Sequence, residues 1–218
     1  MYVDPNTQVH PVRPILRGRL HQVAFLASIA GLVALVEQAS TPRARAVAWI
    51  YGLASALLYL TSSSYHVFAK SPRARRIMQR ADHSMIFVLI AGTFTPIAVL
   101  AVPSPWRWVA LATMWTGALG GVVLKVVALD RFPRLGGALY IVLGWVGVVI
   151  FPALWHRPET LLLIAAGGIL YTIGAVCFSM NRPRLSPRWF GYHEVWHSFG
   201  IVAGVLLFAA NLGLVRAG

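Results

Sequence analysis

The chain has 218 residues, of which 58% are hydrophobic and only 11% are charged, and its mean hydropathy is +0.68. This composition excludes an ordinary soluble domain and predicts a protein that resides in a lipid bilayer. The net charge of +13 would suggest a nucleic-acid partner in a soluble protein. Here the basic residues fall between apolar stretches, so we expect no nucleic-acid partner.

Seven stretches of the chain are long and apolar enough to cross a membrane, which takes roughly 20 residues each. The sequence therefore predicts an all-α membrane protein, a seven-transmembrane helix bundle, with a single domain over residues 21–218. Residues 1–20 are expected to form a short cytoplasmic leader, and the first stretch is expected to be a retained span because no small-residue cleavage site follows it. The predicted spans are 21–40, 46–68, 83–102, 106–127, 135–155, 160–180 and 194–214.

The basic residues also predict how the bundle is oriented. Fourteen of the 19 Lys and Arg residues fall in the leader and in the second, fourth and sixth connections, and five fall on the alternate side. By the positive-inside rule the N-terminus is cytoplasmic and the C-terminus is outside, as in a protein of an inner membrane. The single cysteine, Cys177, excludes an intrachain disulfide framework and a multi-cysteine metal cluster.

Small residues recur within the predicted spans, for example Gly117, Gly120 and Gly121 in the fourth and Gly200 and Gly204 in the seventh. Glycine lets membrane helices approach one another closely, which predicts a compact bundle. The spans lack a continuous polar stripe from one membrane face to the other, so we expect no water-filled pore through a single chain.

Three polar clusters interrupt this apolar pattern, and ionisable residues inside membrane spans are expensive and usually functional. The second span ends with Ser62 to His66, the third begins with Asp82-His83-Ser84, and the seventh begins with His193-Glu194-Val195-Trp196-His197. The predicted topology places all three clusters at the cytoplasmic face. Residues distant in sequence are therefore expected to share one depth.

Helical spacing predicts which of these side chains face each other. His193 and His197 are four residues apart and lie on one face of the seventh span. Polar residues also recur at intervals of four, three and four along the second span, which turns His66 toward the bundle interior. The members of this stripe are Ser55, Tyr59, Ser62 and His66.

Three neutral histidines and a water form an open tetrahedral zinc site, and the absence of thiolates favours zinc over softer metals. We therefore predict a zinc ligand set of His66, His193 and His197. Asp82 is expected to hold the bound water, either as a hydrogen-bond acceptor or as a general base. The alternative is that the histidines are packing residues and that Glu194 simply favours the positive N-terminus of its helix.

The remaining ionisable residues are assigned other roles. His83 points away from Asp82 on a helix and is expected to be structural or interfacial. His10 and His156 lie outside the spans and are expected to be solvated, whereas His21 opens the first span and could line the site. Glu37 is expected at the level of the lipid headgroups, and Tyr65 and Trp196 are expected to pack beside the site.

Three segments together resemble the hemolysin III family: Ser62–His66, Asp82 through Leu89–Pro96, and His193–His197. Members of this family are bacterial relatives of the progestin and adipoQ receptors, which include the adiponectin receptors. The resemblance implies seven spans, a cytoplasmic N-terminus, zinc held at positions His66, His193 and His197, and a water near Asp82 with Ser62 close by. Because the leader is short, the large cytoplasmic domain of the receptor branch is missing. Hormone recognition is therefore not carried over.

Four functions are consistent with these features. The leading hypothesis is a zinc-dependent hydrolase of a lipid amide or ester, similar to alkaline ceramidases, with a membrane lipid as substrate and a free fatty acid as product. Asp82 would take the proton and Ser62 would orient the water or the carbonyl. The alternatives are a non-enzymatic membrane-homeostasis or signalling protein with a structural zinc, a pore-forming cytolysin, and a metalloprotease that uses Glu194.

Overall fold

A computed structural model of the chain describes residues 14–128, 133–186 and 188–218. Within these ranges seven helices are long and apolar enough to span a membrane, which confirms the predicted fold class. Residues 1–13, which include His10, residues 129–132 and Pro187 lie outside the described residues. The elements are α1 (Arg19–Glu37), α2 (Pro42–Phe68), α3 (Pro72–Ala101), α4 (Trp106–Ala128), α5 (Pro133–Val146), the 3₁₀ helix η1 (Gly147–Leu154), α6 (Pro158–Ser179) and α7 (Tyr192–Ala217).

Two helices begin with the same local signal, a hydroxyl cap followed by proline. The Thr41 side chain accepts a hydrogen bond from the Ala44 amide at 3.1 Å, and the Ser71 side chain accepts one from the Ala74 amide at the same distance. Each cap satisfies an amide that would otherwise lack an intrahelical partner. The proline that follows has no amide hydrogen to leave unpaired and already has a helical φ angle.

The Ser71 cap explains why α3 is longer than the predicted third span. The apolar pattern marks the membrane-crossing part from residue 83, but the helix begins at Pro72, eleven residues earlier. The additional turns carry Arg73, Arg75, Arg76 and Arg80. Apolar composition therefore marks the span, whereas the capping residues determine where the helix begins.

The fifth predicted span is a composite. Residues 133–146 form α5, and the chain then continues as the 3₁₀ helix η1 through residue 154. Pro152 lies within η1, where its missing amide hydrogen removes one α-helical hydrogen bond. The predicted span at 135–155 is confirmed in extent, but it is not one regular α-helix.

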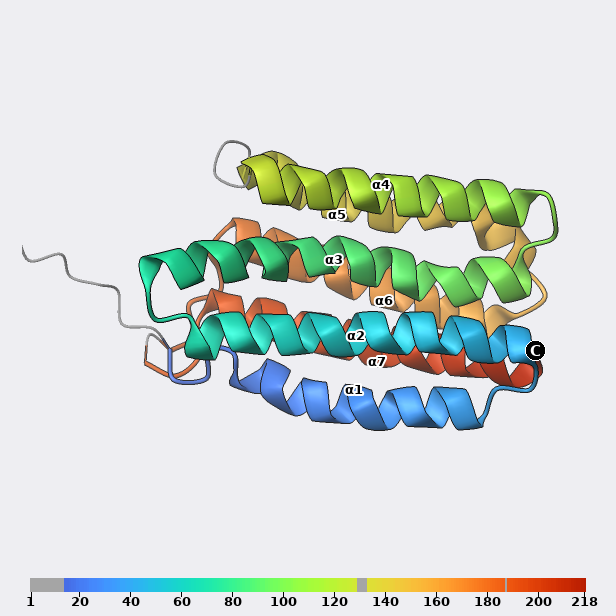
Figure 1. The fold of residues 1–218 in the computed structure, drawn as a ribbon, viewed down its shortest axis with the longest axis horizontal. Helices are drawn as coiled ribbons and strands as arrows, with labels where there is room; N and C mark the ends of the chain where they lie inside the picture. Colours follow the sequence, from blue (N-terminus) through green and yellow to red (C-terminus); the bar gives the residue numbers. More distant parts are fainter. Residues whose placement is uncertain (1–13, 129–132, 187) are drawn as a thin grey trace, which may run out of the picture.

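Consecutive helices run antiparallel along the long axis of the bundle (Figure 1). In this view α2, α3 and α4 lie in front of α5, α6 and α7, with α4 and α5 at one edge and α1 at the other. Helix α1 packs against both α2 and α7, and α3 contacts α7 through the centre. The first and last helices of the chain are therefore neighbours.

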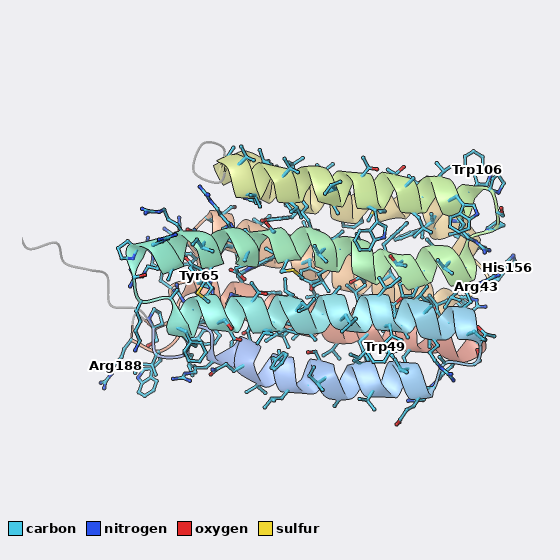
Figure 2. All side chains as sticks on the ribbon, in the orientation of Figure 1. Arg43, Trp49, Tyr65, Trp106, His156 and Arg188 are labelled. Atoms are coloured by element: carbon cyan, nitrogen blue, oxygen red, sulfur yellow. The ribbon has the colours of Figure 1, made fainter. Side chains whose placement is uncertain are left out.

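The connections alternate between the two ends of the bundle. Tyr65 and Arg188 lie at one end, which we call the Tyr65 end, and Arg43, Trp106 and His156 lie at the other (Figure 2). Helix α1 begins at the Tyr65 end and α7 ends at the opposite one (Figure 1). The assignment of the Tyr65 end to the cytoplasm remains a prediction from the charge distribution.

The outer surface of the bundle is apolar. Large hydrophobic side chains with more than half of their surface exposed project from several helices. An exposed apolar surface of this kind fits lipid rather than water as the surrounding solvent. Examples are Val23, Leu26, Leu119, Val149 and Leu162.

Inside the bundle, close helix approach depends on particular small residues. A Cβ atom added at Gly92 on α3 would lie 2.6 Å from the Cβ of Ala54 on α2, and one added at Gly52 would lie 2.3 Å from a methyl group of Leu32 on α1. The buried amide of Asn211 on α7 donates to the Thr93 carbonyl on α3 at 3.3 Å. Helices α1, α2, α3 and α7 are thus held at short distance.

We predict that Gly92→Ala destabilises the bundle by about 1–3 kcal/mol, because the added methyl group collides with Ala54 and forces α2 and α3 apart. The measurement is the free energy of unfolding in detergent. Gly120→Ala is the matched control, since a Cβ atom there meets nothing within 4 Å. Equal stability of the two variants would contradict this account of the α2–α3 contact.

Candidate metal centre

The last turn of α2 places His66 at the Tyr65 end of the bundle. Ser62, one turn earlier on the same helix face, is buried, and the His66 side chain is only 4% exposed. Because the polar stripe predicted along α2 turns inward, the imidazole faces the other helices instead of lipid. Tyr65 packs beside it, with ring centroids 4.6 Å apart.

The first turns of α7 bring two further imidazoles to the same place. The Nε2 atom of His193 lies 3.1 Å from the Nε2 atom of His66. The His197 ring centroid lies 4.6 Å from that of His193 and 5.2 Å from that of His66. The spacing of four residues on α7 therefore presents both rings to the end of α2, as the helical geometry predicts.

The geometry of these three histidines can be compared with that of a metal site. One ligand nitrogen from each residue lies within 4.8 Å of the others. Two nitrogens bound to one tetrahedral zinc ion, each at about 2.0–2.1 Å, lie roughly 3.3 Å apart. The 3.1 Å separation of His66 and His193 is close to this value, and a His197 nitrogen lies within 4.8 Å of both, so the three residues are compatible with a zinc ion.

Asp82 and Ser62 lie beside the imidazoles. The Asp82 Oδ2 atom is 3.9 Å from His66 Nε2, and the Ser62 side chain also lies close to the Asp82 carboxylate. Asp82 is itself buried. The structure therefore brings all five predicted site residues together, with the Asp82 carboxylate next to the histidines.

A fourth histidine, His21 on α1, joins the cluster. Its ring stacks on that of His197 with centroids 3.8 Å apart and planes inclined by 10°, and it meets Tyr59 edge-on at 5.1 Å. The Nδ1 atoms of His21 and His197 are buried without a hydrogen-bond partner among the described residues. The sequence analysis expected only that His21 could line the site, because the contact of His21 with α7 depends on how α1 packs.

Glu194 has a role that the histidine motif alone does not reveal. Its side chain is 0% exposed, Oε1 accepts from the Arg17 guanidinium, and Oε2 accepts from the Gly191 amide at 2.8 Å. The carboxylate thus caps α7 and pairs with a cation next to α1. Both carboxylate oxygens of Glu194 thus have partners other than the histidines. The metalloprotease alternative needs Glu194 as its general base, so this arrangement argues against it.

The segment Pro14–Gly18 crosses the Tyr65 end as a strap. The amides of Ile15 and Leu16 donate to the carbonyls of Arg188 and Trp189 at 2.9 and 3.3 Å. Gly18 has a φ of 80°, and a Cβ atom there would lie 2.6 Å from the Cβ of His66. Glycine is needed at this position because the backbone is left-handed and lies directly against His66.

The other residues assigned from the sequence are placed as follows. The His83 carbonyl accepts a hydrogen bond from the Tyr140 hydroxyl at 2.9 Å, which is a structural role. His156 and Glu37 are exposed, whereas Trp196 packs between Tyr171 and Phe178. Neither His156 nor Glu37 contributes to the cluster.

Two cavities lie deeper in the bundle. One, of about 150 Å³, is almost entirely apolar and is lined by residues of α3 to α7, including Ile86, Tyr140 and Trp196. The other, of about 170 Å³, lies between α1, α2 and α7. Trp196, the neighbour of His197 in the sequence of α7, lines the apolar cavity, and Tyr59, which contacts His21, lines the other; none of the four clustered histidines lines either cavity.

The fold and this cluster define a polytopic helical membrane protein with four histidines and an aspartate buried at one end. The chain matches the family described as Haemolysin-III related over residues 9–208. It therefore belongs to that family, which confirms the resemblance seen in the sequence.

Individual relatives agree with this assignment. The chain is 32% identical over 193 residues to Hemolysin-3 of Bacillus cereus, covering 86% of this chain and 85% of that protein. It is 31% identical over 196 residues to the Hemolysin-3 homolog of Bacillus subtilis, covering 86% and 87%. A more distant similarity, 22% identity over 198 residues, links it to the human monocyte to macrophage differentiation factor, covering 87% and 79%.

We predict that Arg17→Gln lowers the free energy of unfolding by about 3–5 kcal/mol, because it leaves the buried Glu194 carboxylate without its cation. The measurement is denaturant unfolding in detergent. Arg19→Gln is the control: this exposed residue should change stability by no more than about 0.5 kcal/mol. A similar loss of unfolding free energy in both variants would show that the Arg17–Glu194 ion pair stabilises the fold no more than the exposed Arg19 does.

Proposed function

We propose that this protein is a zinc-dependent membrane hydrolase that cleaves an amide or ester bond in a lipid and releases a free fatty acid. One observation carries the proposal: three imidazole nitrogens within 4.8 Å of one another have the buried carboxylate of Asp82 beside them. Three neutral histidines form the ligand set of an open catalytic zinc site. We further propose that the protein resides in the bacterial plasma membrane with the Tyr65 end in the cytoplasm.

His66, His193 and His197 would hold the ion, which would supply Lewis-acid activation of water and of the scissile carbonyl. Asp82 would accept the proton from the attacking water as a general base. The Ser62 hydroxyl would keep the carboxylate oriented by donating a hydrogen bond to it. His21 would hold the His197 ring by stacking on it.

The surroundings of the cluster support a lipid substrate. The cavity lined by Trp196 is almost entirely apolar and suits an acyl chain, because burial of each methylene group contributes about 0.8 kcal/mol. The outer surface of the bundle is in lipid, so an acyl chain does not have to leave the bilayer to reach the site. A membrane lipid, rather than a water-soluble ester, therefore fits the cavity.

A second candidate function is a non-enzymatic one, in which the metal only joins α2 to α7. It is favoured by the strap Pro14–Gly18, which covers the Tyr65 end and packs Gly18 against His66. A buried metal would stabilise the bundle without turnover. The two functions differ in whether the zinc-loaded protein releases a product.

We predict about one zinc ion per purified chain, measured by elemental analysis. His66→Ala and the double variant His193→Ala/His197→Ala should lose the metal, because each removes at least one of only three ligands. His156→Ala, which changes an exposed histidine, should retain it. Metal-free wild type, prepared without chelators, would overturn the zinc assignment.

We predict that Asp82→Asn retains zinc but slows fatty-acid release by about 10²–10⁴-fold, because the amide cannot act as the general base. The measurement is mass spectrometry of fatty acids released from a panel of amide and ester lipids by protein in proteoliposomes. Zinc-loaded wild type that releases no fatty acid, combined with lower stability of His66→Ala, would favour the structural metal.

The name of the Bacillus cereus relative raises cytolysis as a further alternative, which the same proteoliposomes address. Dye release by wild type and His66→Ala is measured in parallel. Strong leakage that does not depend on zinc would replace the hydrolase proposal with pore formation.

A further inference from the structure

A second group of buried nitrogen donors lies at the Tyr65 end, between α3, α4 and α5. Lys125 is in the last turn of α4, and its Nζ atom lies 5.3 Å from the centroid of the Tyr140 ring on α5. The Tyr140 hydroxyl in turn donates to the His83 carbonyl on α3. Tyr140 thus joins three helices around one basic side chain.

Lys125 is only 3% exposed, yet it forms no salt bridge with a carboxylate among the described residues. A buried ammonium without a partner costs several kcal/mol, and the contact with the Tyr140 ring offsets only part of this cost. The neighbouring carboxylate, Asp82, is directed to Ser62 and His66. Among the described residues no carboxylate is left to pair with Lys125, so the position favours an anionic ligand.

Two further donors on α3 are also unsatisfied. The Nδ1 atom of His83 and the Nε atom of Arg80 are buried without a hydrogen-bond partner among residues 14–128, 133–186 and 188–218. Arg80 and His83 are three residues apart, so they lie on the same face of α3. Lys125 is within electrostatic reach of His83. Buried donors of this kind are normally paired.

The chemistry of these groups favours a phosphate group as the ligand. Lysine and arginine are the usual phosphate-binding side chains, and basic pockets between membrane helices on the cytoplasmic side bind acidic lipid headgroups. Tyr140 also lines the apolar cavity, together with Ile86. A phosphate at Lys125 and an acyl chain in that cavity would therefore be the two ends of one amphiphile.

We propose that Arg80, His83 and Lys125 bind the phosphate of an anionic membrane phospholipid whose acyl chain occupies the cavity between α3, α5 and α6. In such a lipid only the glycerol unit separates the phosphate from the acyl ester, and Asp82 is adjacent to His83 in the chain. The ester would then lie near the turn of α3 that carries both His83 and Asp82. That this lipid is the substrate rests on the proposed hydrolase function. That the lipid binds at Lys125 does not depend on that function.

The test measures lipid retention by the full-length protein, purified in detergent with phosphatidylglycerol and phosphatidylcholine at equal concentration and analysed by native mass spectrometry. We expect wild type to retain phosphatidylglycerol about tenfold more than phosphatidylcholine, because three donors without a carboxylate repel a choline group. Lys125→Gln and His83→Gln should each lose most of this preference. Lys125→Arg should keep it, which shows that the position still folds and needs a cation.

Lys70→Gln is the matched control, since this exposed lysine lies in the α2–α3 connection at the same end of the bundle. Equal retention of the two lipids by wild type, or an unchanged preference in Lys125→Gln, would overturn the proposal. In a separate experiment, inorganic phosphate alone is added to the protein that has retained phosphatidylglycerol. Displacement of phosphatidylglycerol by millimolar phosphate would show a free-anion site rather than a lipid site.

The variant His66→Ala separates this inference from the hydrolase proposal. It should lose zinc but retain phosphatidylglycerol like wild type, because the donors at Lys125 lie on other helices and do not require the metal. Loss of lipid preference in His66→Ala would mean that the cluster, and not Lys125, selects the lipid, and would overturn the assignment.

Discussion

The close approach of the three imidazoles depends on the number of spans between them. His66 ends α2 and His193 begins α7, so an even number of membrane crossings must separate them if they are to meet at one face. With α3, α4, the composite of α5 and η1, and α6 in place, their nitrogens lie 3.1 Å apart. If one crossing were missing, about 30 Å of hydrocarbon would separate them. The site therefore depends on the complete bundle.

Polar chemistry is concentrated at one end of an otherwise apolar molecule. Each buried polar group in a bilayer needs a partner, and residues of the site supply some of these partners: Ser62 lies beside Asp82, and Arg17 pairs with Glu194. What is left unsatisfied is informative. Among the described residues, the unpaired nitrogens are those of His21, His197, His83 and Arg80, beside the histidine cluster or Lys125, where a metal and a phosphate are proposed; Ser84 Oγ and Asn211 Oδ1 are the unpaired oxygens.

The sequence was sufficient for features that depend on one helix at a time. Hydropathy predicted seven spans, charge predicted which clusters share an end, and periodicity predicted that His193 and His197 face the same way. The exact packing of α1 could not be predicted in this way, because it depends on the side chains of α2 and α7. The His21–His197 stack and the Arg17–Glu194 pair were missed for this reason, and the change to a 3₁₀ helix at Gly147 was hidden within a uniformly apolar stretch.

The strap Pro14–Gly18 has a consequence for the order in which the protein is made. Its partners are Arg188, Trp189 and Glu194, so a segment that precedes α1 pairs with residues that are made only after α6. Until α7 is inserted, the cluster lacks two of its imidazoles. Assembly of the cluster therefore waits for α7, and a chain truncated before α7 has only His21 and His66 of the four imidazoles.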